Sequence, residues 1–152
     1  MTPEDSRTTP EAGFVVHTRE LEFPMREELD IVDVTAEVAG VVDESKVRAG
    51  TATIFAPGAT GVVTCLEYEP GVLADFREAI ERIAPISGHY QHNVFQDDGN
   101  GHSHVRAGLM GPSLVVPVVE NRMTLGTWQQ IVIINCDNRR RDRRLVVTVT
   151  GV

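Results

Sequence analysis

Histidines are concentrated in one short segment of this 152-residue chain, where four of the five lie between His89 and His104. Neutral imidazole is a common ligand for zinc and related metals, and it exchanges protons near neutral pH. Three imidazoles around a metal with one open position form a catalytic type of zinc site. The segment therefore predicts a functional site, and a polar loop whose histidines have no function is the alternative interpretation.

Three of these histidines, His92, His102 and His104, are the candidate metal ligands. If residues 102–104 are extended, His102 and His104 point to the same side, because side chains alternate along an extended chain. The loop that follows His92 is long enough to fold that residue beside them. The spacing matches no standard motif such as HExxH, so the pattern supports a site without specifying the metal.

Three acidic residues are further candidates for the site. Asp97 and Asp98 precede Gly99-Asn100-Gly101, where they could bind a divalent cation or shape a turn. The full ligand spacing of a calcium loop is missing, which favours the turn. Glu67 stands late in an apolar strand and could act as a general base or a ligand, although the pattern alone favours an outward-facing strand residue.

A basic cluster at a predicted turn could bind phosphate, because guanidinium groups pair with phosphate oxygens through two parallel hydrogen bonds. The cluster consists of Arg139, Arg140, Arg141, Arg143 and Arg144. Asp137 and Asp142 partly neutralise it, and a solvated turn is the alternative. The stretch Gly58-Ala59-Thr60-Gly61 could also offer backbone N–H groups to an anion, but no Gly-Lys-Ser/Thr follows, so it is not a Walker loop.

The elements that must position these residues are mainly strands. Apolar alternation and runs of β-branched residues predict strands over 14–23, 51–57, 62–69, 113–120, 127–137 and 143–151. Helical spacing predicts helices over 30–43 and from Pro70 to Pro85, and a short helix over 105–111 that Gly111 closes. Hairpin turns are expected at Asn121-Arg122 and at 137–139. The pattern predicts one α+β domain over 13–152, with a β-sandwich core and two main helices, after a frayed tail at 1–12.

Composition excludes several classes of protein. The chain carries a net charge of −8, which disfavours broad binding of nucleic acid or membrane surfaces. No apolar run approaches the roughly 20 residues that span a bilayer, and the polar start of the chain predicts a cytoplasmic protein. Cys65 and Cys136 lie in apolar strands and are expected to be buried free thiols. Trp128 is expected to pack in the core or at an oligomer contact.

Three blocks of the sequence resemble the YjbQ family, also called UPF0047 and known for secondary thiamine-phosphate synthase activity. The first block runs from Ala56-Pro57-Gly58-Ala59-Thr60 to Glu67 and into the helix at Pro70. The second contains Tyr90-Gln91-His92 and Asn100-Gly101-His102-Ser103-His104, and continues to Ser113. The third contains Leu125-Gly126-Thr127-Trp128-Gln129, Asp137 and the arginine cluster. Together they cover nearly all of the chain after residue 13.

The resemblance implies a homotrimer whose histidine site lies near the subunit boundaries. His92 and His104 match histidines of the family pattern, and Glu67 aligns with its glutamate. The family's Pro-His-Thr-Thr motif lacks its histidine here, because Gly58 stands in that place, and His102 replaces the aspartate of Asn-x-Asp-x-His. We hypothesise that His102 takes the lost ligand position, so that three imidazoles remain.

The activity implied by the resemblance joins hydroxymethylpyrimidine pyrophosphate to thiazole phosphate and releases pyrophosphate. His92, His104 and Glu67 would be catalytic. Thr60, Arg141 and Arg143 would bind a small phosphorylated metabolite, and a divalent metal, zinc or magnesium, would sit on His92, His102 and His104. The alternative is a non-catalytic trimeric protein that binds a metal or an anion.

Overall fold

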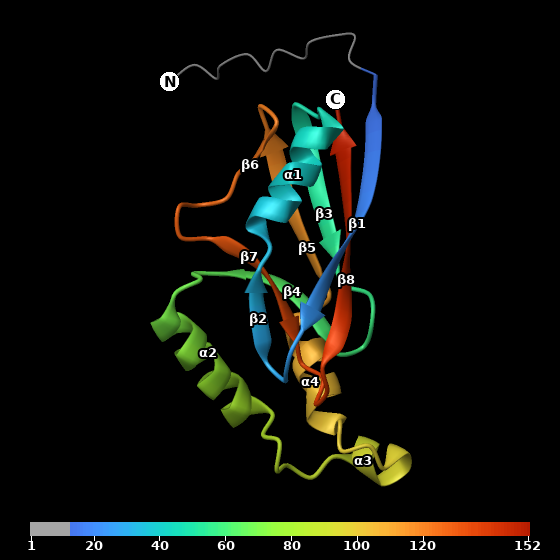
Figure 1. The fold of residues 1–152 in the computed structure, drawn as a ribbon, viewed down its shortest axis with the longest axis vertical. Helices are drawn as coiled ribbons and strands as arrows, with labels where there is room; N and C mark the ends of the chain where they lie inside the picture. The colour runs from blue at the N-terminus through green and yellow to red at the C-terminus, as the bar shows by residue number, and fades with distance from the viewer. Residues whose placement is uncertain (1–12) are drawn as a thin grey trace, which may run out of the picture.

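The computed structural model of the chain describes residues 13–152, and the frayed tail predicted at residues 1–12 lies outside the described residues. Strands and helices follow one another through this range. In Figure 1, α3 and α4 lie at the lower end of the molecule. The elements are β1 (Val15–Met25), β2 (Asp30–Asp33), α1 (Thr35–Ser45), β3 (Ala49–Phe55), β4 (Gly61–Leu66), α2 (Pro70–Ile83), α3 (Gln91–Gln96), α4 (Gly101–Met110), β5 (Ser113–Val119), β6 (Arg122–Met123), β7 (Gln130–Asn135) and β8 (Arg141–Gly151).

Two antiparallel sheets form the framework. The larger has the strand order β1-β8-β3-β5-β6, and the smaller has the order β2-β7-β4. The α+β class with packed sheets is therefore confirmed, although the described residues hold four helices where two main helices and a short third over 105–111 were predicted. None of the helices within residues 13–152 is long and apolar enough to cross a membrane.

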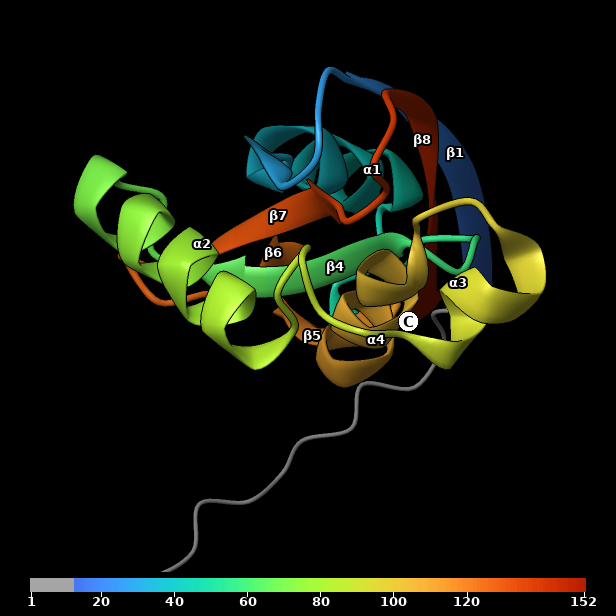
Figure 2. The ribbon, with the colours of Figure 1, turned by 90° about the horizontal axis from the view of Figure 1, so that it is seen from below.

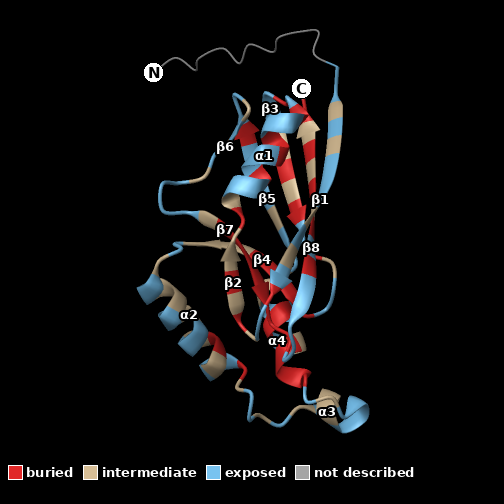
Figure 3. Cartoon of the chain, viewed as in Figure 1, coloured by how far each residue is buried: buried red, intermediate tan, exposed pale blue. Residues whose placement is uncertain are grey.

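The main core lies between the two sheets and under α1. Ile54 and Val147 project from the larger sheet toward Ile131 and Ile133 of β7, and Val38 of α1 closes this core. Each of these side chains is buried, which stabilises the fold by about 1.5–3 kcal/mol per residue of this size. Figure 3 shows buried residues gathered in the sheets and along α4, whereas α2 and α3 are mostly exposed.

A second core lies on the opposite face of the smaller sheet. There Val132 and Ile134 of β7 pack with Ile80 of α2 and Ala107 of α4. Figure 2 shows β4 and β7 as a layer with α1 on one side and α4 on the other. Because β7 is covered on both faces, its sequence is a continuous apolar run rather than an alternating one.

Two local predictions are wrong. The helix expected over 30–43 begins only at Thr35, because residues 30–33 pair with β7 as strand β2. Asp33 ends this strand by accepting hydrogen bonds from the backbone N–H and the hydroxyl of Thr35. The hairpin expected at 137–139 is also wrong, because β7 and β8 belong to different sheets and this segment connects them.

The histidine segment is helical where an extended conformation was expected. Helices α3 and α4 occupy most of residues 91–110, and Gly111 ends α4 as predicted, with a φ of 89°. Trp128 is 72% exposed, so the expectation of core packing is wrong and only the oligomer contact stays a prediction. Of the two free thiols, Cys136 is buried as expected and Cys65 is partly exposed. Burial raises the pKa of Cys136 to about 12.

Gly50 tests the register of the larger sheet, and Gly40 of helix α1 is the control. Gly50 of β3 pairs with Gly151 of β8, and a Cβ at Gly50 would lie 2.0 Å from the carbonyl oxygen of Thr150. Gly50→Ala should therefore lower the free energy of unfolding by about 1–3 kcal/mol. Gly40 in α1 has open space around it, so Gly40→Ala should raise the same quantity by up to about 1 kcal/mol. Urea unfolding of both variants checks the pair, and equal effects would contradict the close approach of β3 and β8.

Candidate functional site

A tight turn brings the ends of α3 and α4 together. Asp97 ends α3 with a left-handed backbone, and Gly99 has a φ of 65°. Asp98 shapes the turn by accepting a hydrogen bond of 3.0 Å from the backbone N–H of Asn100. The turn interpretation of this stretch is therefore confirmed. It places the first turn of α3, with His92, against the first turn of α4, with His104.

His92, Asp98 and His104 form the candidate metal group within residues 13–152. One ligand atom from each lies within 4.8 Å of the others. The two imidazole rings are 4.4 Å apart between centroids, and Nε2 of His92 lies 3.3 Å from Oδ2 of Asp98. The backbone N–H of Asn100 and the nearby His92 hold the pKa of Asp98 below its usual value, so this ligand is ionised at neutral pH. Two imidazoles and one carboxylate are a ligand set found in catalytic zinc sites.

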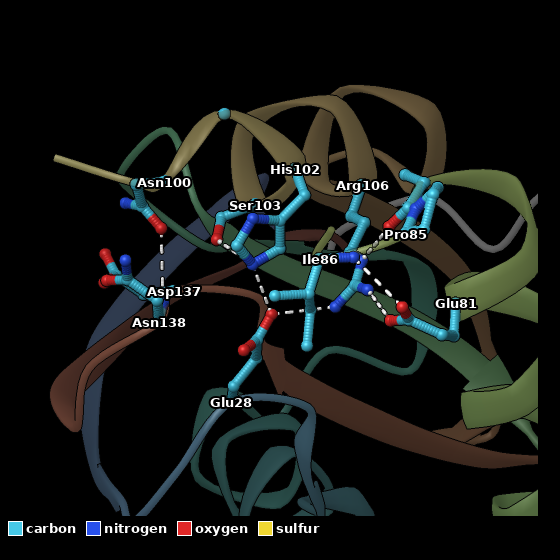
Figure 4. Close-up of polar contacts among 12 residues, drawn as sticks. Glu28, Glu81, Pro85, Ile86, Asn100, His102, Ser103, Arg106, Asp137 and Asn138 are labelled. Atoms are coloured by element: carbon cyan, nitrogen blue, oxygen red, sulfur yellow. Dashed lines mark hydrogen bonds and ion pairs between the residues drawn. The ribbon is translucent and has the colours of Figure 1, made fainter. Parts of the chain in front are cut away.

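His102 does not join this group. Residues two apart on an α-helix differ by about 200°, so His102 and His104 face opposite ways on α4. His102 is 1% exposed, and its Nε2 lies 2.5 Å from Oε1 of Glu28 (Figure 4). The expected arrangement, with both histidines on one side of an extended segment, is therefore wrong. The structure brings together two of the three predicted histidines, with Asp98 as the third member of the group.

A second polar group stands at the same end of the sheets. Arg143 is buried and donates from Nη2 to the hydroxyl and the carbonyl of Thr60, at 2.8 and 2.9 Å. It also donates from Nε and Nη2 to Oδ1 of Asn135, at 3.0 and 2.6 Å. The Thr60 hydroxyl donates to Asp137, which also accepts a hydrogen bond of 2.9 Å from Nε of Arg141. The predicted anion-binding residues Thr60, Arg141 and Arg143 are thus neighbours.

Asp137 and Asn135 are residues of this group that sequence reasoning did not select. Burial on its own raises the pKa of Asp137, but its hydrogen bonds from Arg141 and Thr60 and the charge of Arg141 outweigh burial, and the pKa is lowered. A signal for both was available in the sequence, because they are polar residues that closely follow the apolar run 131–134. Gly58 has a φ of 117°, a conformation that favours glycine, so the loop of this chain is built for the residue it has there.

The two groups are linked by hydrogen bonds from the segment between β7 and β8. The backbone N–H of Asn138 donates to Oδ1 of Asn100, at 3.2 Å, and its side-chain amide donates to the carbonyl of Asp98, at 3.1 Å. Figure 4 shows Asn100 facing Asn138 beside Asp137. The candidate metal group and the Thr60–Arg141–Arg143 group therefore lie next to each other at one end of the molecule.

Glu67 lies elsewhere. It is exposed and follows the last residue of β4, where Leu66 pairs with Gln130. The Thr60 group is at the opposite end of this strand, where Gly61 pairs with Asn135. Five residues of strand separate the two ends by about 16 Å. A single chain therefore does not place Glu67 beside the histidines.

These features define an α+β protein with two antiparallel sheets and, at one end, a candidate site that contains histidines and arginines. Residues 19–152 match the model of a protein family described as UPF0047 protein YjbQ-like. The chain belongs to this family. It is 36% identical to a UPF0047 protein of Methanothermobacter thermautotrophicus, over 90% of this chain and 93% of the relative. It is 34% identical to one of Archaeoglobus fulgidus, over 84% of this chain and 97% of the relative.

Solved structures of similar proteins have the same fold. A YbjQ-like protein of unknown function from Sulfolobus solfataricus superposes with a TM-score of 0.87 at 28% identity, covering 91% of this chain and 99% of the other. A YjbQ/UPF0047 family protein from Clostridium acetobutylicum superposes with a TM-score of 0.79 at 32% identity, covering 86% of this chain and 98% of the other. The family resemblance predicted from the sequence is confirmed.

The lowered pKa of Asp137 gives a test of the buried group. Asp137→Asn should lower the free energy of unfolding at pH 7 by about 2 kcal/mol, because the hydrogen bonds from Arg141 and Thr60 lose a charged acceptor. The folded pKa lies below the unfolded value of about 3.9, so this stabilisation is present above that value and is lost as the pH falls through the folded pKa.

Urea unfolding at pH 7 and at pH 3 measures both effects. The difference between Asp137→Asn and the wild type should shrink at the lower pH. The exposed Asp142→Asn is the control and should change the free energy of unfolding by less than about 0.5 kcal/mol. A difference that is equal at the two pH values would show that the charge of Asp137 does not stabilise the fold.

Proposed function

We propose that this protein is a transferase that acts on a small phosphorylated metabolite with a divalent cation held by His92, Asp98 and His104. The observation that carries the proposal is the proximity of this group to the Thr60–Arg141–Arg143 group. Imidazole ligands favour zinc over magnesium, which binds oxygen ligands almost exclusively, so zinc is the proposed ion. When bound, zinc would neutralise negative charge on phosphate oxygens.

Arg141, Arg143 and Thr60 would have different roles in binding the phosphorylated metabolite. Arg141 uses Nε to bind Asp137 and is about half exposed, so its terminal N–H groups are available to phosphate oxygens at the surface. Arg143 is buried and binds Thr60, so its role is to hold the loop at residues 58–61 in place. Thr60 and the neighbouring backbone would orient the anion.

The reaction proposed first is the one that the family resemblance implies. The thiazole nitrogen attacks the methylene carbon of the pyrimidine, the carbon–oxygen bond breaks, and its electron pair leaves with pyrophosphate. The attacking nitrogen carries a lone pair and no proton, so the transfer depends on stabilising the leaving group more than on a general base. A site that combines a bound cation with arginine suits this requirement.

One observation favours a second function, a non-catalytic protein that binds a metal or an anion. Arg141 is already paired with the carboxylate of Asp137, which neutralises part of its charge, and Arg143 is buried with its donors on Thr60 and Asn135, so both offer less to a leaving group. Zinc-dependent release of pyrophosphate from the pyrimidine pyrophosphate, only when the thiazole phosphate is present, supports the transferase. Zinc binding without turnover on these substrates supports the binding protein.

Zinc affinity tests the cation group directly. His92→Ala and His104→Ala should each weaken zinc binding by more than the about 10–100-fold that is typical for residues that only support a ligand. The exposed His89→Ala is the matched control and should bind zinc like the wild type. Competition against a chelator of known affinity measures all four proteins. A His104→Ala variant with wild-type affinity would overturn the proposed site.

We further propose that Glu67 acts from a neighbouring copy in a homotrimer. Glu67 lies beyond the end of β4 that pairs with Gln130, and the exposed Trp128 is in the loop that leads into the same strand end, which suits a contact between copies. Its carboxylate would stabilise the positive charge that develops on the pyrimidine methylene carbon.

Mixed oligomers test this arrangement. Glu67→Gln and His104→Ala should each be inactive alone, whereas a refolded equimolar mixture should regain activity in about a quarter of its sites, because one site then combines intact residues from two copies. Turnover of the mixture checks this, with the molar mass from light scattering as the control for trimer formation. No recovery in a mixture that forms trimers would contradict a site that combines Glu67 of one copy with His104 of another.

A further inference from the structure

Helix α4 carries His104, yet its buried face is mainly polar. Its buried residues are Gly101, His102, Ser103, Arg106 and Ala107. The apolar contacts of α4 with the second core come from Ala107, which is small, and from the partly buried Met110 at the end of the helix. In the first half of α4, around His104, the rotation of the helix about its axis therefore depends on polar contacts.

These contacts converge on one oxygen of Glu28. Nε2 of His102 lies 2.5 Å from Oε1 of Glu28, and Nη1 of Arg106 donates to the same oxygen at 2.8 Å. His102 and Arg106 are one helical turn apart, so a single carboxylate holds the same face of α4 at two levels (Figure 4). Nδ1 of His102 is buried without a hydrogen-bond partner in the described part of the chain, which increases its dependence on Glu28.

The second carboxylate of the network, Glu81, binds Arg106 of α4 and also accepts a hydrogen bond of 3.0 Å from the backbone N–H of Ile86. Glu81 of α2 accepts from Nη2 of Arg106 at 2.5 Å, and Nε of Arg106 donates to the carbonyl of Ala84. Within residues 13–152, Glu81 makes no hydrogen bond or ion pair with His102, and it is 45% exposed, whereas Glu28 is 21% exposed. Glu81 therefore tethers α4 to α2 at one point and leaves its rotation to Glu28.

The segment that carries Glu28 is itself fixed to the site end of the sheets. The backbone N–H of Leu29 donates to the carbonyl of Asn135 at 2.7 Å, and the side-chain amide of Asn135 donates to the carbonyl of Glu27 at 2.9 Å. Asn135 is the residue that also binds Arg143. Glu28 is thus held by the strand end that positions the Thr60–Arg141–Arg143 group.

We propose that Glu28 is a positioning residue for the cation site. It fixes the rotation of α4 through His102 and Arg106, and on the opposite face of the helix this sets His104 against His92 and Asp98. The inference rests on the proposed function in that His104 is a cation ligand. Without the Glu28 charge, two buried polar groups lose their shared partner, and α4 must turn or shift to solvate them.

Cobalt is the probe, because its visible absorption reports the geometry of its ligands. Glu28→Gln should weaken Co²⁺ binding by about 10-fold or more and change the visible spectrum of the bound ion. Glu81→Gln is the matched control, since it removes a charge from the same arginine, and it should keep the affinity and spectrum of the wild type. Thermal unfolding of both variants measures how far each one destabilises the fold. If Glu28→Gln fails to fold, Glu28→Asp takes its place, with the same expected direction.

The imidazole NMR signals of His104 in the cation-free protein provide a readout that needs no metal. They should move in Glu28→Gln and stay in place in Glu81→Gln. Wild-type protein that binds no Co²⁺ would overturn the proposed function, and the NMR comparison would still decide whether Glu28 positions His104. Cobalt affinity and His104 signals that are the same in Glu28→Gln as in the wild type, or that change equally in Glu81→Gln, would overturn the inference.

Discussion

The buried guanidinium of Arg143 joins the two sheets at the end where both candidate groups lie. Arg143 belongs to β8 of the larger sheet, and it binds Asn135 of β7 and Thr60, which precedes β4 of the smaller sheet. Burial lowers its pKa, and the nearby carboxylate of Asp137 opposes that effect. A buried charge without partners costs several kcal/mol. The two sheets can therefore pack together at this end only when Asn135, Thr60 and Asp137 are all present.

The partners of Arg143 make further contacts, and these contacts set the geometry of the site. Asn135 also fixes the segment of Glu28, which holds the inner face of α4. Asp137 is followed by Asn138, which holds the turn between α3 and α4. The outer face of α4 and the first turn of α3 then carry His104 and His92. His92 and His104 are partly exposed residues of two short helices, and Asp98 lies in the turn between them, but a buried polar framework sets their positions.

The sequence predicted this fold and site unequally, for physical reasons. His92 and His104 were identified because histidine is rare elsewhere in the chain, and the sheets because β-branched runs are strong signals. Helix α4 was missed in its first half because its buried face consists of His102, Ser103 and Arg106, so it has no apolar periodicity there. That error placed His102 beside His104, whereas a helix places them apart.

The remaining gaps come from contacts between distant parts of the chain. Glu28 is one of two adjacent acidic residues in a connecting segment, and nothing nearby in the sequence indicates that it meets a histidine 74 positions away. Asp98 was assigned to a turn, which is correct, but its second carboxylate oxygen also faces His92. The catalytic role expected of Glu67 depends on a neighbouring copy and remains a proposal.

An anomalous difference map from crystals grown with zinc, measured at the zinc absorption edge, would show directly whether His92, Asp98 and His104 bind the ion. We expect one strong peak per chain, bonded to His92, Asp98 and His104, with His102 still paired with Glu28. A peak bonded to His102, or zinc-saturated crystals with no peak between the three proposed ligands, would contradict the proposed cation site.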